Sequence, residues 1–133
     1  MQLPIVILSA ERPEYDAAEN AARTARLAAE LEGRDYAVTL ALGIWEGRAE
    51  VSLIVALDSD RYVQWHIGEL SAIAQRYQQD AILYAAFSGR ATLIFGADTS
   101  ADTDIGVWRK VSQNEAQALP GYTLTEGEYY AAL

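Results

Sequence analysis

The sequence predicts a single α+β domain in which one mixed or antiparallel sheet packs against two main helices. Three observations favour this fold class. Short apolar runs alternate with two segments of helical period, turn residues join two pairs of strands into hairpins, and the first six elements follow the order βαββαβ. That order is typical of a ferredoxin-like split unit, whose antiparallel sheet carries both helices on one face.

The first predicted elements are a strand and a helix. Residues 5–8 form a short, continuous apolar run rich in β-branched side chains, which is typical of a buried strand. Asp16 is the expected N-cap of the helix that follows, because Glu19 stands three residues later at the capping-box spacing. Small and apolar residues then recur at helical spacing as far as Gly33, which we expect to end the helix in a left-handed conformation.

The middle of the chain predicts a hairpin and a second helix. Strands at 36–42 and 49–57 flank a turn at 45–48, and the second strand has one aliphatic face and one mixed face. An amphipathic helix follows to about residue 78, with its N-cap expected within residues 58–60 (Asp-Ser-Asp).

The remaining elements complete the expected domain, which spans residues 1–133. A second hairpin is predicted from two apolar segments, 81–87 and 91–95, so that the core covers about residues 5–95 and 96–133 form a C-terminal extension. Within the extension, 107–111 is expected to be an edge strand. Thr125 and Glu128 have the spacing of a capping box and predict a short C-terminal helix.

The charge balance limits the classes of partner. Asp and Glu number 19 against 10 Lys and Arg, for a formal net charge of −9. Nucleic acids and anionic membranes attract clustered cations, which this sequence lacks, so neither is an expected direct partner. The acidity itself has two interpretations: a solubilising surface, or a surface that mimics the nucleic-acid backbone.

Composition excludes several kinds of chemistry. The chain has no Cys and a single His, His66, so disulfides, thiolate metal sites and cysteine nucleophiles are excluded, and no metal or cofactor is expected. No apolar run approaches the ~20 residues of a membrane span, and no basic segment opens the chain. We therefore expect a cytoplasmic protein, in the host cytoplasm if a phage encodes it.

Asn20 is the most informative polar position. It continues the inward line of the first helix, where an amide must find partners or cost about 1–3 kcal/mol. One interpretation is that Asn20 tethers the loop through Pro13 by hydrogen bonds. The alternative places Asn20, with Glu19 and Arg23, in a ligand pocket at the start of the helix.

A second set of candidates comes from the strand at 49–57 and from the end of the second helix. Glu50 and Ser52 are adjacent on the mixed face of the strand, where they could provide acid–base groups or simply face solvent. Gln79 stands at the junction between helix and strand, where it could cap helix carbonyls or face Asn20 across one end of the sheet.

These polar positions carry a family resemblance. The pattern consists of Ser9-Ala10-x-x-Pro13, Glu19-Asn20, Glu50-x-Ser52 and Gln79-Asp80-Ala81-Ile82. It resembles a small domain-of-unknown-function family of bacteria and phages over about residues 5–95. Since that family has no activity to transfer, the resemblance implies a bacterial or phage origin and a shared polar cluster.

The sequence leaves three functional hypotheses. The first is a non-enzymatic binding protein that acts on a host or phage protein, such as a phage counter-defence inhibitor. The second is a small-molecule pocket protein that binds or hydrolyses a nucleotide-like ligand. The third is an acidic mimic of nucleic acid. Under each binding hypothesis the candidate contact residues are Glu19, Asn20, Arg23, Glu50, Ser52 and Gln79.

Overall fold

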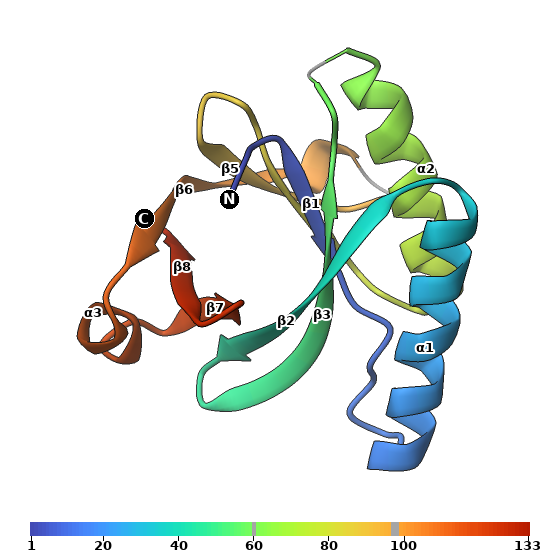
Figure 1. The fold of residues 1–133 in the computed structure, drawn as a ribbon, viewed down its shortest axis with the longest axis horizontal. Coiled ribbons are helices and arrows are strands. Elements are labelled where there is room, and N and C mark those ends of the chain that lie inside the picture. Colours follow the sequence, from blue (N-terminus) through green and yellow to red (C-terminus); the bar gives the residue numbers. More distant parts are fainter. Residues whose placement is uncertain (60, 97–98) are drawn as a thin grey trace.

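The backbone closes into a β-barrel. A computed structural model describes residues 1–59, 61–96 and 99–133, and within them eight antiparallel strands follow the order β1-β3-β2-β7-β8-β6-β5-β4 around the barrel (Figure 1). The strands are β1 (Ile5–Leu8), β2 (Ala37–Trp45), β3 (Arg48–Ala56), β4 (Ile82–Ala85), β5 (Arg90–Ile94), β6 (Thr103–Val111), β7 (Gly121–Thr125) and β8 (Glu128–Ala132). The helical elements are α1 (Ala17–Gly33), α2 (Val63–Arg76), the short α3 (Gln113–Gln117) and the 3-10 turn η1 (Thr99–Ala101).

The closed barrel shows that the ferredoxin-like prediction is wrong. The order of the first six elements along the chain is as expected, but β7 pairs with β2 and β8 pairs with β6, so the sheet has no free edge. The segment expected to be an extension therefore supplies three barrel strands. Within the segment predicted as an edge strand, Val107 pairs with β5 and residues 108–111 pair with β8.

The predicted C-terminal helix is replaced by the hairpin of β7 and β8. Thr125 pairs with Glu128 across a two-residue turn. Glu126 and Gly127 both have positive φ, at 49° and 76°, which is the geometry of the tight hairpin turn. The tyrosines of β8 favour extended backbone, and the Thr125 hydroxyl donates to the Leu40 carbonyl at 2.8 Å rather than capping a helix.

The two long helices cover one side of the barrel, and α3 lies at the opposite end (Figure 1). Leu27 and Leu31 of α1 and Leu70 of α2 pack with Leu53 and Val55 of β3 in one apolar cluster. No helix among the described residues has the length and apolar character needed to cross a membrane.

A second apolar cluster fills part of the barrel interior. Side chains alternate between the two faces of a strand, so Ile5 and Ile7 of β1 and Ile54 of β3 join an inner cluster with Trp108 and Tyr130. Where the helices cover the barrel, its strands therefore pack against the helices on the outer face and against the inner cluster on the other face.

The ends of the helices agree only in part with the sequence. Asp16 caps α1, accepting from the Glu19 amide at 2.8 Å, as predicted. Gly33 ends α1, but the left-handed residue is Asp35, with φ of 65°. At α2 the N-cap is Tyr62, which is left-handed and makes no side-chain capping bond, whereas the Ser59 hydroxyl accepts from the Arg61 amide in the preceding turn. Asp60 and residues 97–98 lie outside the described residues.

Candidate functional site

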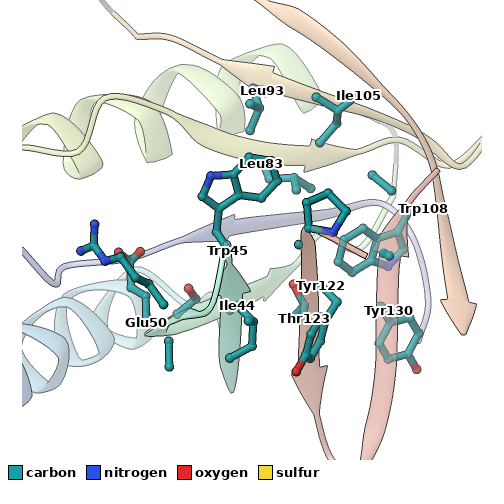
Figure 2. A pocket seen from close by; sticks show the side chains of 18 residues that line it. Ile44, Trp45, Glu50, Leu83, Leu93, Ile105, Trp108, Tyr122, Thr123 and Tyr130 are labelled. Carbon is teal, nitrogen blue, oxygen red and sulfur yellow. The ribbon is translucent and has the colours of Figure 1, made fainter. Parts of the chain in front are cut away.

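A cavity of about 680 Å³ opens into the barrel, a volume within the range of small-molecule sites. Figure 2 shows its wall, to which β2, β3, β6, β7 and β8 all contribute. Two glycines lie in the wall: Gly43 has no side chain beside Glu50 and Ser52, and the Trp45 ring packs where Gly121 has none. Glycine on β2 and β7 thus allows neighbouring strands to bring their side chains close at the cavity wall.

One wall of the cavity is polar. Arg48, Glu50 and Ser52 alternate along β3 and all line the cavity, as the period of two requires for residues that share a face. Burial raises the pKa of the Glu50 carboxyl above its ordinary value. The Ser9 hydroxyl and the charge of Arg48 oppose this rise, and the charge of Glu11 adds to it. Glu50 is thus a poorly solvated carboxylate beside an open space.

The rest of the wall is aromatic and aliphatic. Trp108 of β6 and Tyr130 of β8 are buried and stack in parallel, with ring centroids 5.8 Å apart. Trp45, at the end of β2, lines the same cavity but remains 61% exposed (Figure 2). Leu83, Leu93 and Ile105 complete the apolar part.

This combination is suited to an organic cation that carries an aromatic group. A desolvated carboxylate gains most from a positive ligand, because the ligand replaces lost solvation. Aromatic faces attract cations and stack with planar rings. The cavity is poorly suited to a polyanion, because Arg48 is the only basic residue among those that line it.

Of the residues predicted from sequence, Glu50 and Ser52 lie on the cavity wall. Asn20, Arg23 and Gln79 come together elsewhere, on the loop that joins β1 to α1. Asn20 Oδ1 accepts from the Arg12 amide and Asn20 Nδ2 donates to the Arg12 carbonyl, each at 2.9 Å. The amide of Asn20 therefore holds the loop, as the tethering interpretation describes.

Arg23 and Gln79 bind the same loop. Arg23 Nε donates to the Ala10 carbonyl at 2.7 Å, and Arg23 Nη2 donates to the Tyr77 carbonyl at 2.6 Å. Gln79 Nε2 donates to the Glu11 carbonyl at 2.9 Å. These bonds join the loop to the end of α2.

Glu19 and Asn20 have no part in the barrel cavity. Glu19 is exposed and forms a 3.4 Å ion pair with Arg26. Asn20 borders a separate groove between α1 and the outer face of β2 and β3. The structure thus groups Asn20, Arg23 and Gln79 around a loop and separates them from Glu50 and Ser52.

Sequence reasoning missed the other half of the cavity. The turn expected at 45–48 contains Trp45 and Arg48, and the expected extension contains Trp108 and Tyr130. No local sequence pattern predicts that β7 pairs with β2 or that β8 pairs with β6. The available signal was Gly43, a small residue in a strand otherwise suited to packing, which indicates close approach or a void.

The fold and the site define a small β-barrel protein with an internal cavity that is lined by aromatic, aliphatic and a few charged side chains. The model of the S-adenosylmethionine lyase family matches residues 6–133. Because this match covers nearly the whole chain, the protein belongs to the S-adenosylmethionine lyase family. A search of curated protein sequences finds no match.

The family corrects the leading functional hypothesis. A family of lyases points to an enzyme, so the hypothesis of a non-enzymatic phage counter-defence inhibitor is wrong, and the small-molecule alternative fits better. The resemblance to a small domain family holds at that coarse level, but the match gives no support to a phage origin. The sequence has no nucleophile motif or metal-ligand cluster typical of an enzyme, which is why it gave no sign of a lyase.

Proposed function

We propose that this protein is a lyase that cleaves S-adenosylmethionine inside the barrel cavity. Membership of the family supports the reaction class. The observation that carries the location is the half-buried Glu50 carboxylate on a wall otherwise built largely from aromatic and aliphatic side chains.

The substrate brings its own leaving group. Its sulfur is a sulfonium that carries a methyl group, an adenosyl group and the γ-carbon of an amino acid. When the bond between sulfur and the γ-carbon breaks, sulfur keeps the electron pair and leaves as a neutral thioether, 5′-methylthioadenosine. The enzyme therefore has to position the substrate and to stabilise the change in charge as the bond to sulfur breaks.

A lyase consumes no water, so the new bond that the γ-carbon forms after losing sulfur must come from another atom of the substrate. In one route the substrate carboxylate attacks the γ-carbon and closes a lactone as the thioether leaves. In the other, a base removes a proton from the β-carbon and a double bond forms as the thioether leaves. Glu50 orients the cationic substrate in the first route and accepts the proton in the second.

The polar wall fits the amino-acid end of this substrate. The Glu50 carboxylate attracts the sulfonium and the ammonium group, and the Arg48 guanidinium, two residues away on the same strand face, suits the substrate carboxylate. Binding of the cation stabilises the ionised form of Glu50 and so offsets its burial. Binding should therefore weaken as the pH falls through the raised pKa of Glu50.

The test is to identify both products. Purified protein is incubated with S-adenosylmethionine in ¹⁸O-labelled water, and the products are separated and weighed by mass spectrometry. We expect 5′-methylthioadenosine and an unlabelled fragment with the mass of either a lactone or an unsaturated amino acid. Early incorporation of ¹⁸O into the amino-acid fragment, or absence of the thioether, would contradict the proposal.

A further inference from the structure

Trp45 is the cavity ring with the most free surface. Trp108 and Tyr130 are 8% and 9% exposed and already stack on each other, whereas Trp45 is 61% exposed. Tyr122 is half-buried against Tyr129, with centroids 5.9 Å apart. Trp45 can therefore accept a planar partner without displacing a neighbour.

Gly121 fixes where the Trp45 ring lies. The two residues are opposite each other on β2 and β7. A Cβ atom on Gly121 would lie 2.4 Å from Trp45 Cε3 and 2.8 Å from Cζ3, which is too close for any side chain. The turn that follows Trp45 is also held, because the Glu46 amide donates to the Pro120 carbonyl at 2.7 Å.

The spacing to Glu50 matches the two ends of one ligand. Trp45 is opposite Arg48 in the pairing of β2 with β3, and Glu50 is the next residue on the same face of β3. Such diagonal neighbours are about 7–8 Å apart. In S-adenosylmethionine only the ribose separates the adenine base from the sulfonium, so a base on Trp45 leaves the sulfonium within reach of Glu50 (Figure 2).

We propose that Trp45 is the surface on which the adenine of the substrate stacks, and that Gly121 is the positioning residue that allows it. This inference rests on the proposed function and names the part of the ligand that the site selects. The site should then prefer adenosine-bearing ligands over simple sulfonium amino acids, because stacking on an aromatic side chain contributes substantially to the binding of a nucleobase.

The first test replaces the ring. Trp45→Ala should raise the KM for S-adenosylmethionine about tenfold or more, with a smaller effect on kcat. Inhibition by 5′-methylthioadenosine, which keeps the base, should weaken to a similar extent. Inhibition by S-methylmethionine, a sulfonium without a base, should change less than twofold. Trp65→Ala is the matched control, since Trp65 is 62% exposed on α2 and does not line the cavity.

The second test moves the ring without removing it. Gly121→Ala should produce the same pattern of KM and inhibition, and combining it with Trp45→Ala should add little. Circular dichroism and melting temperature verify folding, and Trp45→Leu replaces Trp45→Ala if the latter does not fold.

The outcomes separate this inference from the proposed function. If the wild type forms 5′-methylthioadenosine and Trp45→Ala leaves both KM and inhibition within twofold, the stacking surface is refuted and the lyase stands. If Trp45→Ala weakens S-methylmethionine equally, the ring holds the sulfonium and the inference is again refuted. If the wild type forms no thioether, the proposed function fails and the inference fails with it.

Discussion

Glu50 shows how a single residue could combine a stability cost with the binding role that we propose for it. Its carboxylate lies on the cavity wall, and burial raises its pKa. A group whose ionised form is destabilised by the fold is one that a cationic ligand can stabilise, and such groups concentrate at functional sites. The same property predicts how Glu50 affects the folded state.

Glu50→Gln should stabilise the protein at neutral pH. Because the folded state holds the Glu50 proton to a higher pH than the unfolded chain, stability falls as the pH rises between the two pKa values. The amide does not titrate, so the variant should have a higher free energy of unfolding than the wild type at neutral pH. This difference should vanish below the ordinary pKa of 4.5. Urea unfolding at several pH values measures this. A variant that is less stable at neutral pH would contradict the account.

Asn20 has a different role at the residue scale. Asn20→Ala leaves the Arg12 amide without its side-chain acceptor and removes one of the two donors to the Arg12 carbonyl, and it should cost about 1–3 kcal/mol of unfolding free energy. Glu19→Ala, at the exposed neighbouring position, is the control and should cost less than about 1 kcal/mol. Unchanged unfolding combined with lost activity would favour a ligand role for Asn20 over the tether.

At the scale of elements, the closure of the barrel depends on the hairpin of β7 and β8. This hairpin pairs with β2 on one side and β6 on the other. Its turn places Glu126 in a left-handed conformation, with φ of 49°, which is unfavourable for a residue with a long side chain. The turn is thus a point where local preference and the fold disagree.

Glu126→Asn should stabilise the protein by roughly 0.5–1 kcal/mol, since Asn-Gly is the preferred sequence for this turn. Glu126→Val should destabilise it, because a β-branched residue is strained at positive φ. Thermal unfolding of both variants provides the measurement. Equal changes in thermal stability for Glu126→Asn and Glu126→Val would contradict the left-handed conformation of residue 126.

The elements also show what a sequence can and cannot predict. The α1 start at Asp16 and the β2–β3 and β4–β5 hairpins were predicted, because caps, turns and alternating side chains act within a few residues. The barrel was not, because the pairings of β2 with β7 and β6 with β8 join distant segments without a local signal. The spacing of Thr125 and Glu128 fits both a helix cap and a tight hairpin, and the pairing around the barrel decided between them.

The same limit applied to the candidate site. Glu50 and Ser52 form a polar pair on a mixed strand face that is visible in the sequence, and they lie on the cavity wall, but their role as contact residues stays a prediction. Asn20 and Gln79 were equally visible, but their partners are backbone groups of one loop. Trp45, Trp108 and Tyr130 meet only when the barrel closes, so the aromatic part of the cavity could not be foreseen.

At the scale of the whole molecule, the cavity wall and the apolar core of the barrel share side chains. Two clusters pack around β1 and β3, one outside against the helices and one inside with Ile5, Ile7 and Ile54. The inner cluster shares Trp108 and Tyr130 with the cavity wall. The cavity wall is therefore built on strands that the core packs, as the proposed reaction needs for a positioned substrate.

The most direct test of the account is the rate at which 5′-methylthioadenosine forms from S-adenosylmethionine with the wild type and with Glu50→Gln. Glu46→Gln is the matched control, because Glu46 is exposed in the turn next to the cavity and does not line it. We expect turnover by the wild type, a loss of roughly a hundredfold or more in kcat/KM for Glu50→Gln, and a change of less than twofold for Glu46→Gln. Wild-type turnover that persists in folded Glu50→Gln would contradict the assignment of the barrel cavity as the active site.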